Sequence, residues 1–273
     1  MTSADLGDET RWRVAGEERA DRDPVILLTG VGETPLDSCD FLFSMLARHY
    51  RVVSIDLGGL AAAPGESLQL DQLVEHVARV VDLVVPGRQL SVIGYSTAAL
   101  VAVAFVASRC AAARAVLIAG WVESTARLRL FLELWQRLSE QDAAVLGDFA
   151  RFSLLSPAFI GNGASHPMES LRPICLSRFS DAQVDFLLTT DLAEIAPKIA
   201  VPTLVIGSAH DSIVSIDQAR SLFAAIPDAR YLELDSGHAA VIERPAEVLS
   251  HIEIFLQDPG RYPPGSMIVS AGP

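Results

Sequence analysis

The chain has 273 residues, half of them apolar, and a formal net charge of −13 at pH 7. This length and apolar content suit a large α/β core, while the acidity argues against binding to nucleic acid or to an anionic membrane, which require basic patches. Its three cysteines, Cys39, Cys110 and Cys175, are far apart and have no CxxC neighbour. This fits free thiols in a reducing compartment better than disulfides or a zinc site.

The N-terminal residues and the apolar runs give no sign of targeting or membrane insertion. Residues 1–8 are polar and acidic, unlike a signal peptide with its charged and then apolar segments. The longest apolar run, 98–107, is too short for a spanning helix, which takes about 20 residues. We therefore expect a cytoplasmic protein without a membrane partner.

Strand and helix signals alternate over the first 120 residues. Residues 1–8 are expected to be irregular, and a short exposed edge strand is expected at 9–16. Apolar runs that follow predict buried strands, and amphipathic or Ala-rich runs between them predict helices. The strands are expected at 24–30, 51–57, 90–95 and 114–120, and the helices at about 35–48, 73–84 and 97–108.

The rhythm changes in the middle of the chain. Over residues 121–199 strand signals give way to amphipathic helical stretches, which predicts a helical cap inserted after the fourth recognisable strand. Alternation then resumes, so the core comprises 9–120 and 200–257, and the Pro- and Gly-rich tail 258–273 is expected to be irregular. Apolar strands alternating with helices are typical of an α/β fold with a mostly parallel central sheet and helices on both faces. The later strands are expected at 202–208 and 229–234, and the later helices at about 215–225 and from 245.

A serine lies on the turn between the strand at 90–95 and the following helix, in the sequence Gly94-Tyr95-Ser96-Thr97-Ala98. A residue on such a sharp turn is held out of the sheet, and the helix N-terminus beside it offers N–H groups and partial positive charge to a developing oxyanion. This is the pattern of a nucleophile elbow. The alternative, a small residue required by a tight turn, is disfavoured by the strand–turn–helix context.

Two further side chains follow buried strands and complete a hydrolytic set. A neutral serine needs a base within reach, and the base needs an orienting carboxylate. His238 follows the last recognised strand and Asp211 follows the strand before it, so the order Ser96, Asp211, His238 is the one that accompanies this elbow. Asp211 can instead serve as a helix cap, and Glu123 and Asp235 are its competitors for the role of acid.

These motifs resemble the α/β-hydrolase fold superfamily in its capped serine-hydrolase form, over about residues 24–255. The resemblance rests on the elbow at 94–98, the acid loop around Asp211, and the Ser-Gly-His sequence that ends at His238. It implies the elbow serine as nucleophile, the histidine as general base and the aspartate as the acid that orients it. No metal or cofactor is expected, because no cysteine has a CxxC neighbour and Gly30 and Gly32 lack the third glycine of a nucleotide-binding fingerprint, where the chain has Pro35.

The resemblance also implies an oxyanion hole formed by the backbone N–H groups of Val31 and Thr97. Ala98 stands where the elbow motif commonly has glycine, and its methyl group is expected to be tolerated with a slightly wider gap between helix and strand. Thr29 stands where a His-Gly pair is common, but backbone amides bind the oxyanion, so the hole is expected to survive. Residues 56–62 lack the Arg-Gly-His-Gly-type segment often found there, a departure that does not involve the triad.

The insertion is rich in apolar and aromatic residues, which favours a hydrophobic substrate pocket, although several of these side chains must form the insertion's own core. The candidates for lining the pocket are Tyr95, Trp121, Phe131, Trp135 and Phe152.

We expect a serine hydrolase that cleaves an ester or thioester of a hydrophobic small molecule through an acyl-enzyme, the acyl group being free or carrier-bound. A carbon–carbon bond hydrolase would use the same triad. One alternative is a lyase or cyclase of natural-product type in which the histidine acts on the substrate directly. Another is a non-catalytic ligand-binding member, against which the intact Ser/Asp/His set argues.

Overall fold

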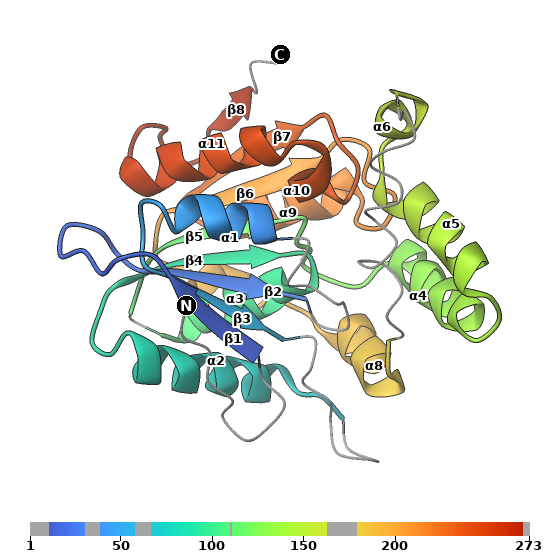
Figure 1. Ribbon diagram of the computed structural model, residues 1–273, viewed down its shortest axis with the longest axis horizontal. Helices are drawn as coiled ribbons and strands as arrows, with labels where there is room; N and C mark the ends of the chain where they lie inside the picture. The colour runs from blue at the N-terminus through green and yellow to red at the C-terminus, as the bar shows by residue number, and fades with distance from the viewer. Residues whose placement is uncertain (1–10, 31–38, 58–66, 110, 163–178, 270–273) are drawn as a thin grey trace.

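A mixed eight-stranded sheet is the centre of the computed structural model, which describes residues 11–30, 39–57, 67–109, 111–162 and 179–269. The strand order is β1-β3-β2-β4-β5-β6-β7-β8 (Figure 1). Only the pairing of β1 with β3 is antiparallel, so the predicted mostly parallel sheet is confirmed. The strands are β1 (Arg11–Ala15), β2 (Val25–Thr29), β3 (Val52–Asp56), β4 (Leu90–Tyr95), β5 (Ala112–Ile118), β6 (Thr203–Ser208), β7 (Ala229–Leu234) and β8 (Met267–Val269).

Helices cover both faces of this sheet, as predicted, because strands β2, β3, β4 and β6 are buried at every residue and need cover on each side. One apolar core joins the sheet to α2, α3 and α9, and a second joins it to α1, α10 and α11. The bounds of these helices are α1 (Asp40–Leu46), α2 (Leu70–Val84), α3 (Thr97–Ser108), α9 (Ile216–Ala225), α10 (Ala240–Glu243) and α11 (Pro245–Gln257).

A helical insertion separates β5 from β6 and stands to one side of the sheet (Figure 1). Local capping explains where its helices begin: the Thr125 hydroxyl accepts a hydrogen bond from the Leu128 N–H, and the Asp142 carboxylate accepts one from the Ala144 N–H. The insertion that the sequence predicted is therefore present. Its described helices are α4 (Ala126–Ser139), α5 (Ala143–Leu154), α6 (Pro157–Asn162), α8 (Asp181–Thr189) and the 3-10 turn η1 (Ala196–Lys198).

The C-terminal tail differs from expectation. Residues 258–273 were expected to be irregular, yet Met267–Val269 form β8, which pairs in parallel with β7. Three apolar residues are too few to show the alternation that predicts a strand. This strand is recognised only from its pairing with the otherwise open edge of β7. Residues 1–8 and the expected start of the first helix at 35–38 lie outside the described residues.

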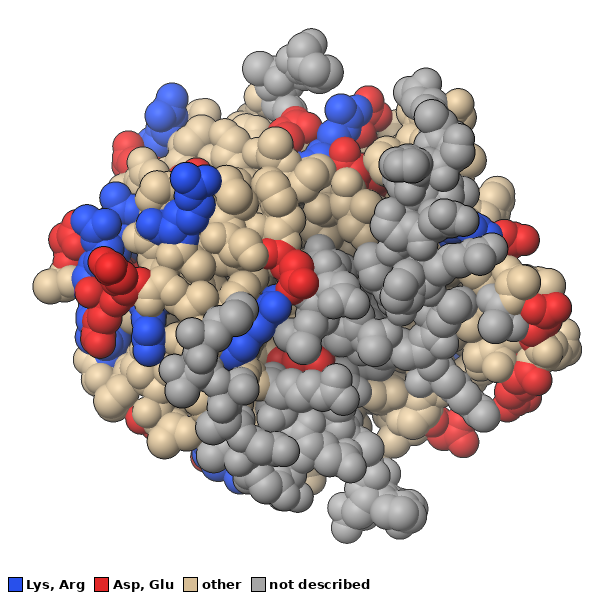
Figure 2. All heavy atoms as spheres, in the orientation of Figure 1, with Lys and Arg blue, Asp and Glu red and all other residues tan. Residues whose placement is uncertain are grey.

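The described surface carries charges of both signs. Figure 2 shows Asp and Glu side chains along the outer edge of the insertion, and Lys and Arg interspersed with Asp and Glu at the opposite end. Exposed pairs such as Arg88–Glu18 and Arg109–Glu75 contribute about 0–1 kcal/mol each to stability. Among the helices that the structure describes, none has the length and apolarity needed to cross a membrane.

Helix α3 packs very closely on β4, the strand that leads to Ser96. A Cβ atom added at Gly94 would lie 2.6 Å from the Ala102 Cβ and 2.8 Å from the Ala99 Cα. Since the second of these is a backbone atom, the clash cannot be relieved by a rotamer change. The helix that presents Ser96 is thus held at a distance that only glycine permits.

We predict that Gly94→Ala lowers the free energy of unfolding by about 2–3 kcal/mol through overpacking. Urea unfolding followed by circular dichroism would measure it. The matched control is Gly161→Ala in α6, where an added Cβ meets no atom within 4 Å. Equal stability of the two variants would contradict the proposed close packing of α3 on β4.

Candidate active site

Ser96 occupies the turn between β4 and α3 in a strained backbone conformation, with φ 54° and ψ −125°. Positive φ is uncommon for a residue with a side chain and persists where the surroundings enforce it. Here the Ser96 N–H donates to the Ile118 carbonyl of the neighbouring strand at 2.8 Å, while the Ser96 carbonyl accepts from the Ala99 N–H in α3 at 2.9 Å. Thr97 is the first residue of α3, so its N–H lies where the helix dipole favours negative charge.

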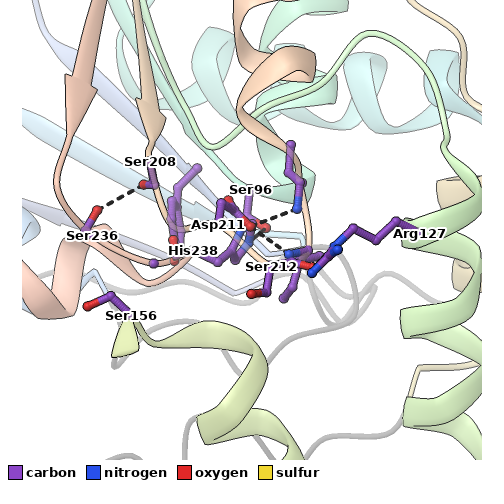
Figure 3. A network of polar contacts seen from close by, with 12 residues as sticks. Ser96, Arg127, Ser156, Ser208, Asp211, Ser212, Ser236 and His238 are labelled. Atoms are coloured by element: carbon purple, nitrogen blue, oxygen red, sulfur yellow. Dashed lines mark hydrogen bonds and ion pairs between the residues drawn. The ribbon is translucent and has the colours of Figure 1, made fainter. Parts of the chain in front are cut away.

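Three side chains from separate loops form a continuous chain of hydrogen bonds (Figure 3). The Ser96 Oγ is 2.8 Å from the His238 Nε2, and the His238 Nδ1 is 2.7 Å from the Asp211 Oδ2. The side chains of His238 and Asp211 are only 3% and 2% exposed. With Nδ1 donating its proton to the carboxylate, Nε2 is the acceptor that faces the serine hydroxyl.

The second oxygen of Asp211 is held by its own loop. The Asp211 Oδ1 accepts hydrogen bonds from the backbone N–H groups of Ile213 and Val214, both at 2.8 Å. These bonds fix the carboxylate plane, so Oδ2 remains directed at the imidazole. They form a local turn and not a helix cap, since α9 begins at Ile216 with Ser215 as its N-cap.

The two competing acids lie elsewhere. Asp235 contacts the imidazole of His210 at 2.9 Å, and both of these side chains are exposed. Glu123 is exposed, and its backbone N–H donates to Gln218. Of the three candidate carboxylates, the structure therefore brings Asp211 to His238.

The loop that carries His238 is supported from the core of the sheet. The Tyr95 hydroxyl donates to the His238 carbonyl at 3.2 Å, and the two rings are 6.1 Å apart. The Ser236 and Ser208 hydroxyls are 3.1 Å apart (Figure 3), which joins the ends of β7 and β6. Tyr95 was predicted as a pocket residue, and in the structure it is buried in the core formed with α11.

The other residues predicted to line a pocket are dispersed. Trp135 is buried in an aromatic cluster of the insertion, with its ring 5.5 Å from that of Phe131. Trp121 is buried after β5, whereas Phe152 is 74% exposed. Contact of these residues with a substrate stays a prediction, and Val31, predicted for the oxyanion hole, lies outside the described residues.

Two contacts near His238 were not anticipated from the sequence. The carboxylate of Glu243 bonds to the backbone of Gly237 and to Ser156 at the start of α6. Glu243 ends α10, a four-residue helix too short to leave a periodic pattern in the sequence. Only its position five residues after the histidine could have drawn attention to it.

The family of this chain is known from its similarity to other proteins. The model of the alpha/beta hydrolase family matches residues 25–251. The chain belongs to this family. The predicted family and enzyme class, an α/β-hydrolase-fold hydrolase, are thereby confirmed.

One curated relative and several solved structures are similar to this chain over most of its length. The pyrrolizixenacetamide deacetylase of Xenorhabdus hominickii is 30% identical over 240 residues, which cover 85% of this chain and 90% of that protein. Among solved structures, the enol-lactonase of Burkholderia xenovorans LB400 has a TM-score of 0.78 at 24% identity, covering 94% of this chain and 100% of that one. A thermophilic esterase of Thermogutta terrifontis has a TM-score of 0.76 at 18% identity, with 94% and 97% covered. The two structural likenesses show the shared fold.

Proposed function

We propose that this α/β hydrolase is a serine hydrolase with Ser96 as nucleophile, His238 as general base and Asp211 as the acid that orients the base. The observation that carries the proposal is the unbroken hydrogen-bonded chain from the Ser96 Oγ through the imidazole to Asp211. Both bonds lie within the 2.6–3.2 Å reach expected between a nucleophile, its base and the group that orients the base, and the proton transfer itself takes place between Ser96 and His238. The strained φ at Ser96 supports it further, because such strain collects at functional sites.

In the proposed reaction the His238 Nε2 takes the hydroxyl proton of Ser96 as Oγ attacks the acyl carbon. Asp211 stabilises the imidazolium, and the N–H of Thr97, together with that of Val31, binds the oxyanion. Collapse breaks the bond to the leaving group, which takes the proton from Nε2 and departs. Water then attacks the acyl-enzyme, gives a proton to Nε2, and the acid leaves as the proton returns to Ser96.

The substrate we propose is an ester or thioester of a hydrophobic small molecule, with its acyl group free or carrier-bound. Support comes from the insertion, residues 121–199, which we propose acts as a cap over the strand ends. Most of the described aromatic side chains of the insertion pack against one another. Other apolar residues there, such as Leu130 and Phe152, are exposed, which suits contact with an apolar ligand. Deacetylation of a small molecule is a second candidate, favoured by the name of the Xenorhabdus hominickii relative.

A series of p-nitrophenyl esters from acetyl to dodecanoyl, with p-nitroacetanilide as the amide, tests this proposal. We expect ester hydrolysis that rises with acyl length and falls to background in Ser96→Ala. A preference for the acetyl ester or the anilide would favour the deacetylase candidate instead. Background rates with every compound would contradict the hydrolase proposal and favour the lyase or ligand-binding alternatives.

A further inference from the structure

The loop carrying His238 is fixed by the helical insertion as well as by the sheet. The Ala239 N–H donates to the Leu154 carbonyl at 2.9 Å, and a Cβ added at Gly237 would lie 2.6 Å from both the Leu154 carbonyl oxygen and the Ser156 nitrogen. The backbones of the two segments therefore abut. Both neighbours of His238 in the chain are therefore held at residues 154–156: Ala239 bonds directly to Leu154, and Gly237 bonds to the Glu243 carboxylate that also binds Ser156.

Glu243 is the side chain that joins these two segments. Its Oε1 accepts hydrogen bonds from the Ser156 N–H at 2.8 Å and the Gly237 N–H at 3.0 Å. Its Oε2 accepts one from the Ser156 hydroxyl at 2.6 Å. Hydrogen bonds to an ionised acceptor are about twice as strong as neutral ones, and two of the donors are backbone groups that cannot move away without shifting the loop.

The groups that donate hydrogen bonds to Glu243 are buried, so loss of its carboxylate is costly. Ser156 is only 2% exposed and Gly237 is buried, so loss of the carboxylate would leave donors without a partner away from water. Another contact of the insertion, from the Arg127 guanidinium to the Ser212 carbonyl in the acid loop, is exposed (Figure 3). Exposed contacts of this kind are weak, so Glu243 is the stronger connection.

We propose that Glu243 is a positioning residue that couples the insertion to the general base. It acts on the reaction through the backbone of Gly237, which sets where the imidazole of His238 stands between Ser96 and Asp211. The inference rests on the proposed function, because it assigns Glu243 a role only if His238 accepts the proton of Ser96. The side chains of a catalytic site must be held within about 0.5 Å of the geometry in which they react.

The test compares Glu243→Ala and Glu243→Gln with the wild type by the rate of labelling with a fluorophosphonate, which reports activation of the serine independently of ester binding. A displacement of about 1 Å at a reacting group costs roughly 100-fold in rate. We expect Glu243→Ala to slow labelling and kcat by about 30- to 100-fold with little change in KM. Glu243→Gln keeps an amide oxygen for the two N–H groups and is expected to stay within about 5-fold of the wild type.

Two further variants keep the test independent of folding. Ser156→Ala removes the hydroxyl's bond to Glu243 and the capping bond that the hydroxyl accepts from the Phe159 N–H, and it is expected to slow labelling by about 3-fold. Glu247→Gln, an acid in the next helix, is the matched control and is expected to leave labelling unchanged. Urea unfolding in the assay buffer gives the folded fraction of each variant. The pH dependence of kcat/KM is also recorded, because its acidic limb reports protonation of the general base His238.

The outcomes separate this inference from the proposed function. Slower labelling of a fully folded Glu243→Ala variant, with a shifted pH limb and recovery in Glu243→Gln, supports the positioning role. Wild-type labelling by a folded Glu243→Ala variant, or a loss that the unfolded fraction accounts for, overturns the positioning role alone. If wild-type protein is not labelled at Ser96, it is the proposed function that fails.

Discussion

Replacement of Ser96 by alanine is expected to lower kcat for ester hydrolysis by about 10⁴- to 10⁶-fold, with KM changed little. The variant loses the oxygen that attacks the acyl carbon, while the oxyanion donors at the start of α3 and the surrounding apolar side chains remain. Those groups leave some residual catalysis over the reaction in water. Steady-state kinetics with the preferred p-nitrophenyl ester, at enzyme concentrations high enough to detect the residual activity, would measure the loss.

A second serine nearby provides the control for this substitution. Ser212 lies in the acid loop beside Asp211, and its backbone carbonyl is the atom that contacts Arg127 (Figure 3). Ser212→Ala is expected to stay within about 3-fold of wild-type kcat, as surface substitutions usually do. Turnover in Ser96→Ala at a rate near that of the wild type, on any substrate of the wild type, would instead indicate a reaction driven by His238 alone, as in the lyase alternative.

The isosteric change Asp211→Asn is expected to lower kcat by about 10⁴-fold without unfolding the protein. The asparagine oxygen can still accept the hydrogen bonds from Ile213 and Val214, so the loop is retained. The amide NH₂ then faces the His238 Nδ1 in place of the carboxylate oxygen. Because an NH₂ group can only donate, it requires Nδ1 to be an acceptor, which moves the ring proton to Nε2. The imidazole then presents a donor to Ser96 and cannot take its proton.

The competing carboxylate supplies the matched control here. Asp235→Asn weakens an exposed pair with His210, and kcat is expected to stay within about 2-fold. Activity and urea unfolding are measured for both variants under one buffer condition. If Asp235→Asn lost activity while Asp211→Asn retained it, the assignment of the acid would be wrong.

The sequence was most informative where function and backbone geometry depend on the same local pattern. Ser96, Asp211 and His238 each follow a buried strand, and parallel strands bring their carboxyl ends to one edge of the sheet. Their convergence could therefore be predicted from apolar runs, turn residues and chain order. The helices on both faces followed from the same alternation.

What the sequence did not indicate depends on contacts between distant segments. Helical periodicity marks one apolar face but not its partner, so it could not distinguish the buried Trp135 from the exposed Phe152. The strand β8 requires the free edge of β7. The bond from Glu243 to Ser156 joins residues that are 87 positions apart, and no local pattern encodes such a pairing.

The central claim, that Ser96 is an activated nucleophile, is tested most directly by reaction with a fluorophosphonate followed by mass spectrometry of the intact chain and its peptides. In this reaction the Ser96 Oγ would form a bond to phosphorus as fluoride leaves. We predict a single adduct on the peptide that contains Ser96, no adduct in Ser96→Ala, and much slower labelling in Asp211→Asn. Absence of an adduct from folded wild-type protein, or an adduct that persists in Ser96→Ala, would contradict the claim.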